Sequence, residues 1–157
     1  FDLSDVLNLE LGGSYVAAPS GTRRRLYGVD LALRHQPGSS SFYQGAVLGS
    51  EWYWNDQEFL DGAGGSERFR RDGGYAYLEG FFGRSFSGGI LFDHAEEIAD
   101  EAARQNTYAG FVTWKPSEFQ RLRFQLGEID QSGPNDLRVW LQWTAFIGSH
   151  SHGFANR

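Results

Sequence analysis

The chain has 157 residues, contains no cysteine and no methionine, and carries a formal net charge of −6 at pH 7. The length suits one domain, and the lack of cysteine excludes disulfide frameworks and thiolate metal sites. The acidic balance, without a basic stripe, argues against nucleic acid as a partner. No apolar stretch approaches the length of a transmembrane helix, which excludes a helical membrane protein.

The dominant pattern along the chain is period-two alternation of apolar and polar residues, and it predicts eight β-strands. The first four are expected at Asp5–Ala18, Arg23–His35, Ser41–Trp54 and Gly73–Phe82. The last four are expected at Ser85–His94, Thr107–Trp114, Phe119–Glu128 and Leu137–Ser149. The third segment is apolar on both faces, and there we assign Tyr43, Val47 and Tyr53 to the outward face.

The connections between these segments differ in length on the two sides of the predicted sheet. Asn55–Asp72 and Ala95–Gln105 are long, polar and charged, and the second is rich in helix-forming residues, which predicts a helical turn. The connections on the other side are short, as at Lys115–Glu118. Long loops on one side and tight turns on the other are typical of outer-membrane barrels.

Aromatic residues make up 16% of the chain, and many fall near the ends of the predicted strands. Two interfacial belts would have this appearance. One belt would contain Tyr15, Tyr27, Tyr53 and Tyr108, and the other Tyr43, Phe82, Phe86 and Trp114. In hydrocarbon every backbone polar group needs an internal partner, so the strands must close on themselves. We therefore predict an all-β fold: an antiparallel, up-and-down transmembrane β-barrel with about eight strands in this chain, forming a single domain over residues 1–157.

The polar face of such a barrel would line its interior and set its solute preference. The residues predicted to line this lumen carry both charges and are Glu10, Asp30, Arg34, Glu79, Asp93, Arg121, Arg123 and Arg138. The alternative is a soluble β-barrel that binds a small ligand, with the aromatic face as its inner core. Periodicity alone does not distinguish the inside of a barrel from the outside.

His94 and Glu97 are the candidate metal ligands, because they lie three residues apart in an acidic segment. Imidazole and carboxylate groups can bind zinc, and a helical turn would bring these two onto one face. An acidic loop without a metal is the alternative. We expect no catalysis: Asp93 and His94 are adjacent in a strand, so their side chains point to opposite faces, and the spacing places no serine beside them.

The segment Thr113–Gln125, with the letters T-W-K-P-S-E-F-Q-R-L-R-F-Q, resembles the penultimate hairpin of bacterial outer-membrane porin-like proteins described as zinc-regulated or TonB-dependent-receptor-like. The ending Val139–Gly148, followed by His150 and His152, resembles the last strand and tail of that family, and Gly74–Asp93 is similar more weakly. The tail departs from the family by continuing past Phe154.

This resemblance implies a location in the bacterial outer membrane and a transport or porin role, for metal ions or small solutes. The partners that it implies are the lipid bilayer with its lipopolysaccharide and the machinery that assembles barrels. Family members are longer, which implies that this chain is the C-terminal part of a larger barrel; the lack of methionine agrees with that expectation. Zinc is the candidate cofactor.

Overall fold

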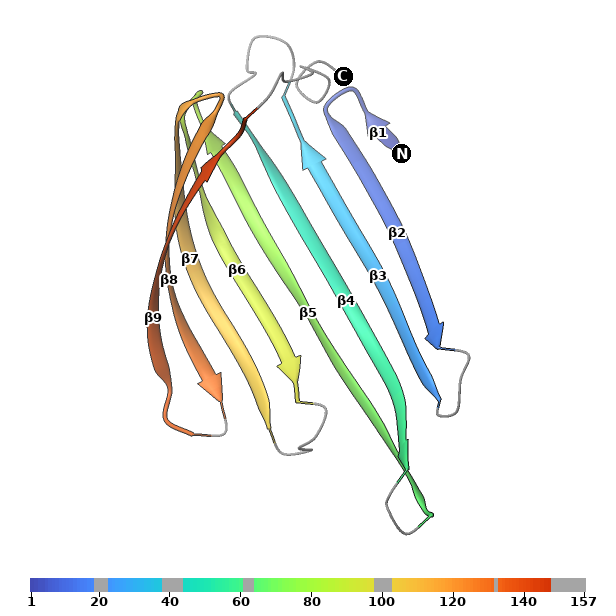
Figure 1. Ribbon diagram of the computed structural model, residues 1–157. Helices are drawn as coiled ribbons and strands as arrows, with labels where there is room; N and C mark the ends of the chain where they lie inside the picture. Colours follow the sequence, from blue (N-terminus) through green and yellow to red (C-terminus); the bar gives the residue numbers. More distant parts are fainter. Residues whose placement is uncertain (19–22, 38–43, 61–63, 98–102, 132, 148–157) are drawn as a thin grey trace.

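The computed structural model describes residues 1–18, 23–37, 44–60, 64–97, 103–131 and 133–147, and they form one antiparallel β-sheet. Its nine strands pair in chain order, each with the next, so the topology is up-and-down throughout (Figure 1). In the part of the chain that the structure describes, no helix is long and apolar enough to cross a membrane. The strands are β1 (Asp2–Ser4), β2 (Leu7–Ala18), β3 (Arg24–His35), β4 (Gln44–Leu60), β5 (Ser66–Phe82), β6 (Phe86–Glu96), β7 (Arg104–Ser117), β8 (Gln120–Gln131) and β9 (Asp136–Ala145).

The all-β, antiparallel, up-and-down prediction is confirmed, and each of the eight predicted segments overlaps a strand. The short β1, which pairs with the start of β2, was not predicted. The sheet is strongly twisted and curls at its β7–β9 end (Figure 1). It is open: among the described residues, β1 and β9 lie at its two edges and do not pair with each other.

The prediction of a long loop at Asn55–Asp72 is wrong, because β4 and β5 continue as a protruding hairpin (Figure 1). The sequence there is polar on both faces, which suggested a loop, but opposite charges face each other across the two strands. Glu58 lies opposite Arg68 in the ladder. The Arg68 guanidinium also donates two hydrogen bonds to the Asp56 carboxylate.

The predicted helical turn in Ala95–Gln105 falls largely on residues 98–102, outside the described residues.

The two faces of the sheet differ in chemistry. One, which we call the apolar face, carries Leu11, Val29, Leu48, Leu78, Ile90, Val112, Phe124 and Leu141, which the ladder places on the same side. The other, the polar face, carries Glu10, Asp30, Glu79, Asp93, Arg123 and their neighbours. All described residues in the buried class belong to the polar face, and they are Gly28, Gly49, Ser87, Thr107, Ala109, Phe111, Thr113, Gly127 and Ile129. The sheet therefore curls with the polar face on its inside.

The assignment of Val47 and Tyr53 to the outward face is wrong. The register of β3 against β4 pairs Leu33 with Leu48 and Val29 with Trp52. Leu48, Trp52 and Trp54 therefore lie on the apolar face, and Val47 and Tyr53 lie on the polar face. Alternation could not decide this, because both faces of β4 are apolar. Tyr43 lies outside the described residues.

Glycines on the polar face give room to aromatic rings from the next strand. Gly28 lies directly opposite Tyr53, Gly49 opposite Tyr77, and Gly89 opposite Phe111. In each pair a Cβ on the glycine would collide with the ring. An aromatic ring that covers a cross-strand glycine shields its backbone and fixes the register. These pairs let bulky side chains fill the inside of the curve without separating the strands.

Candidate functional site

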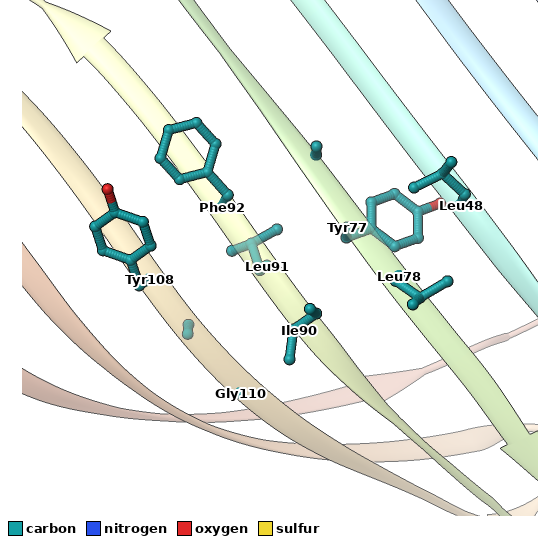
Figure 2. A pocket seen from close by; sticks show the side chains of 10 residues that line it. Leu48, Tyr77, Leu78, Ile90, Leu91, Phe92, Tyr108 and Gly110 are labelled. Carbon is teal, nitrogen blue, oxygen red and sulfur yellow. The ribbon is translucent and has the colours of Figure 1, made fainter.

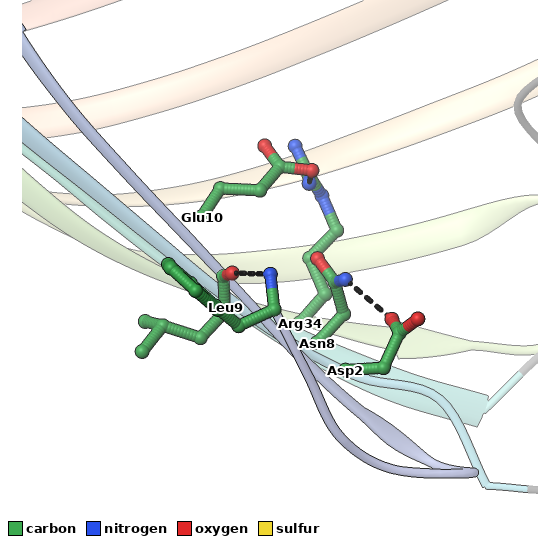
Figure 3. Close-up of polar contacts among 6 residues, drawn as sticks. Asp2, Asn8, Leu9, Glu10 and Arg34 are labelled. Carbon is green, nitrogen blue, oxygen red and sulfur yellow. Dashed lines mark hydrogen bonds and ion pairs between the residues drawn. The ribbon is translucent and has the colours of Figure 1, made fainter.

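All eight residues predicted to line a lumen lie on the polar face. The acidic members lie on β2, β3, β5 and β6, and all the arginines except Arg34 lie on β8 and β9. Glu10 and Arg34 form an ion pair across β2 and β3, with both side chains about half exposed. Figure 3 shows this pair on one side of the sheet, with Leu9 turned to the other. That these residues line a lumen stays a prediction, because the described sheet is not closed.

A hydrogen-bonded acidic centre lies near the middle of the polar face. Glu51 accepts a hydrogen bond from the Tyr53 hydroxyl and another, at 3.0 Å, from the Tyr75 hydroxyl. One strand pair away, the Ser87 hydroxyl donates to the Glu79 carboxylate at 2.5 Å. Sequence reasoning did not include Glu51, because it lies in the segment whose two faces could not be distinguished.

The basic side of the polar face is built on β8 and β9. The guanidinium of Arg123 lies over the Phe111 ring, 3.5 Å from its centroid, which is a cation–π contact. Arg138 forms an ion pair with Asp136 on the same strand, with Nε 2.7 Å from the carboxylate oxygen. Among the residues predicted to line a lumen, the carboxylates thus lie on β2, β3, β5 and β6 and three of the four arginines lie on β8 and β9, an uneven charge distribution that would act on a nearby ion.

The apolar face is exposed. Ile90 is 64% exposed and Leu141 is 73% exposed, whereas Phe111 and Ile129 on the polar face are 4% and 2% exposed. A groove of about 510 Å³ crosses the middle of the apolar face. Ala76 and Gly110 are among its small lining residues, and the side chains of Leu48, Leu78, Ile90, Phe92 and Tyr108 surround it (Figure 2).

An uncharged band runs across the apolar face from β2 to β9. On β5 it extends from Phe82 to Gly74, and on β9 from Trp143 to Leu137, without a charged residue on this face. Charged groups follow at the end where the β4–β5 hairpin lies, and they include Arg25, Asp56, Asp72, Glu96, Arg104 and Glu128.

Aromatic rings lie at both margins of this band. Tyr15, Tyr27 and Trp54 follow one another across the ladder at the charged margin, with the two tyrosine rings 5.1 Å apart. At the opposite margin Phe82, Phe86 and Trp114 are neighbours, with 6.5 Å between the rings of Phe86 and Trp114. Of the predicted belt residues that the structure describes, only Tyr53 lies on the other face.

The predicted metal pair is divided by the structure. His94 lies on the apolar face at the charged margin, but Glu97 follows the end of β6, and Glu96 is the residue on the same face. Asp72, His94 and Glu96 bring their ligand atoms within 4.8 Å of one another. The sequence did not indicate Asp72, because it was assigned to a loop, and Glu97 was preferred over its neighbour Glu96 because a helical turn was expected in place of a strand.

Comparison of the sequence with protein-family models and curated proteins, and of the structure with solved structures, finds no match. The resemblance of Thr113–Gln125 and Val139–Gly148 to porin-like proteins stays a prediction. The chemistry of the two faces is therefore the basis for assigning a function.

Proposed function

We propose that this sheet forms a wall of an outer-membrane β-barrel of the transport type. The polar face would border an aqueous lumen and the apolar face would contact lipid. The observation that carries the proposal is the uncharged, exposed band that crosses eight strands on the outside of the curve. An exposed apolar patch of this extent is atypical of a monomeric soluble protein and marks a surface that is covered by another apolar phase or partner.

The dimensions of the band agree with a bilayer. From Phe82 to Gly74, β5 advances about 27 Å at about 3.4 Å per residue. Barrel strands tilt by about 35–45°, so this length corresponds to roughly 20 Å along the bilayer normal, near the 25 Å expected of an outer-membrane barrel. The aromatic rows at the two margins occupy the levels where tyrosine and tryptophan concentrate in membranes.

The polar face supports passage of small charged solutes. Rings of charged side chains set the ion preference of many pores. Here the predicted lumen-lining carboxylates, on β2, β3, β5 and β6, lie on the same inner face as the arginines of β8 and β9. The predicted solutes are metal ions or other small ions, and the predicted location is the bacterial outer membrane, with lipid, lipopolysaccharide and the barrel-assembly machinery as partners.

The proposal places one requirement on the edges of the sheet. In hydrocarbon an unpaired strand edge is not tolerated. In a bilayer, the edges formed by β1 with β2 and by β9 must therefore be paired, with each other or with other strands. A second consequence is that the groove beside Ile90 would be filled by acyl chains.

The soluble ligand-binding barrel has weaker support. It needs an apolar interior, but the inside of the curve combines buried apolar residues such as Phe111 with buried polar residues such as Thr113 and Ser87, and it also carries the charged residues of the polar face. The apolar face lies on the outside of the curve, so rolling the sheet further in the same direction would leave that face exposed.

Detergent dependence of folding tests the proposal. The purified chain should give β-sheet circular dichroism and heat-modifiable gel migration in detergent micelles or lipid vesicles, and should aggregate in plain buffer. Reconstituted protein should also produce ion conductance in planar bilayers. A folded, monomeric chain in plain buffer would contradict the membrane assignment, and detergent-dependent folding without conductance would contradict transport alone.

A further inference from the structure

Two neighbouring strands bring a group of metal-binding side chains to the charged margin of the apolar face. Asp72 comes from β5, and His94 and Glu96 come from β6. Trp52 on β4 and Asn106 on β7 flank them. Because the ligand residues lie on paired strands and not on a loop, the ladder fixes their spacing.

The orientation of His94 is set from both sides. Its Nδ1 lies 2.7 Å from Oδ1 of Asn106. An amide oxygen only accepts hydrogen bonds, so this contact places the ring proton on Nδ1 and leaves the lone pair of Nε2 available. In metal-binding histidines, the ring N–H that does not face the metal almost always donates a hydrogen bond to an oxygen in this manner.

The Trp52 ring holds the other side of the imidazole. The two rings stack with 5.7 Å between centroids and 6° between planes. Gly74 lies between them in the ladder, and a Cβ there would come within 2.6 Å of the Trp52 ring. The glycine therefore allows the stacking across β5, and the stacking restricts rotation of the imidazole.

The two carboxylates are also oriented by hydrogen bonds. Trp52 Nε1 donates to Asp72 Oδ2 at 2.8 Å, and the backbone N–H of Asp72 donates to Glu96 Oε2 at 3.1 Å. Neither carboxylate forms an ion pair with an arginine or lysine of the described chain, although Arg104 lies opposite Glu96 in the ladder. Two neighbouring half-buried carboxylates without a cation repel each other, and a divalent ion would remove that repulsion.

We propose that Asp72, His94 and Glu96 bind one divalent transition-metal ion of the zinc type, through Nε2 of the imidazole and one oxygen of each carboxylate. A nitrogen and two oxygens suit zinc and its first-row neighbours better than calcium or magnesium, which prefer oxygen alone. Metal–ligand distances of about 2.0 Å in a tetrahedron need ligand atoms about 3.3 Å apart. The ligand atoms of the three residues lie within 4.8 Å of one another, so side-chain rotations alone would bring them to this spacing. Three protein ligands leave the fourth position for water.

The site is independent of the membrane assignment, because it lies within β4–β7 and does not require the sheet to close. Isothermal titration calorimetry of the untagged full chain with Zn²⁺, in detergent micelles, should give one bound ion. His94→Asn should abolish this binding. Asn106→Ala removes no ligand but frees the imidazole, and should weaken Zn²⁺ binding by about 10- to 100-fold.

Matched controls separate this site from chance histidine binding. His35 lies on the same face but at the end of β3 that is away from the charged margin. His35→Asn should therefore leave Zn²⁺ affinity unchanged. The double change His150→Asn with His152→Asn in the tail should also leave it unchanged. Circular dichroism and gel migration of each variant show that it is folded. A second readout uses Co²⁺, a paramagnetic probe that should quench Trp52 in a variant with the other four tryptophans changed to phenylalanine.

The proposal is overturned by any of three results. The first is Zn²⁺ binding that persists in folded His94→Asn or disappears in a control variant. The second is Ca²⁺ binding as tight as Zn²⁺ binding and insensitive to His94→Asn, which would mean that the imidazole is not a ligand. The third is an absence of Zn²⁺ binding by the folded wild-type chain.

Discussion

Leu141→Arg is the substitution that most clearly distinguishes a lipid-facing surface from a solvated one. Leu141 lies in the middle of the apolar stretch of β9 and is 73% exposed, so the surrounding protein cannot cover a new side chain there. Gln142, the next residue, lies on the polar face and is also exposed. Gln142→Arg is therefore a matched control that adds the same charge to the same strand.

The expected magnitude follows from the surroundings of each position. An arginine on the lipid face of an outer-membrane barrel destabilises it by about 2–4 kcal/mol at the bilayer midplane. That cost corresponds to a decrease of roughly 30- to 1,000-fold in the folding equilibrium constant. In water an exposed leucine replaced by arginine would change stability by only about 0.5 kcal/mol in either direction. Gln142→Arg should stay within about 0.5 kcal/mol in either medium.

Urea unfolding in lipid vesicles, followed by tryptophan fluorescence, measures the free energy of unfolding of each variant. The membrane account predicts a large loss for Leu141→Arg and almost none for Gln142→Arg. Equal and small effects would refute the assignment of the apolar face to lipid. A larger loss for Gln142→Arg would show that the two faces have been assigned the wrong way round.

Three further predictions concern the polar face and the protruding hairpin. Gly49→Ala should destabilise the folded chain by about 1–3 kcal/mol, because the new methyl group collides with the Tyr77 ring. Gly13→Ala, on the open apolar face, should destabilise it much less. Urea unfolding measures the free energy of unfolding of both variants, and equal losses would contradict the packing of aromatic rings over glycines. Arg68 lowers the pKa of Asp56 chiefly by hydrogen bonding, so the pair stabilises the hairpin fully at pH values above the ordinary carboxyl pKa of about 3.9, and this stabilisation is lost as the pH falls through the lowered pKa of Asp56. Hydrogen exchange at the hairpin of the wild type should therefore accelerate as the pH falls through this range. If Arg68→Gln showed the same pH response as the wild type, the pairing would be contradicted. Arg121→Gln should shift the reversal potential of the reconstituted protein toward cation preference, because it removes a positive charge from the basic side of the polar face, and an unchanged potential would place this side chain outside the conduction path.

Much of the fold follows from local alternation. Period-two alternation predicts all eight segments in which the long strands lie. This pattern also placed all eight charged residues, from Glu10 to Arg138, on one face. The sequence could therefore predict which side chains share a surface before any pairing was known.

The errors come from interactions across strands, which a single segment does not reveal. The orientation of β4 depends on its register with β3, where Leu33 meets Leu48. The long β4–β5 hairpin is held by cross-strand charge pairs such as Asp56 with Arg68. Asp72, His94 and Glu96 come together only because the register of β5 against β6 places Asp72 beside Glu96, 24 residues later in the chain.

The most direct test of the central claim uses two tryptophans on one strand. Trp143 lies on the apolar face and is 64% exposed, while Trp140, three residues earlier on β9, lies on the polar face. Two variants would each retain one of them, with the other tryptophans changed to phenylalanine, and would be folded into vesicles of brominated lipid. The account predicts strong quenching of Trp143 by the brominated acyl chains and quenching of Trp140 by aqueous iodide only. Equal quenching of both by iodide, with no effect of brominated lipid on Trp143, would contradict a lipid-facing apolar surface.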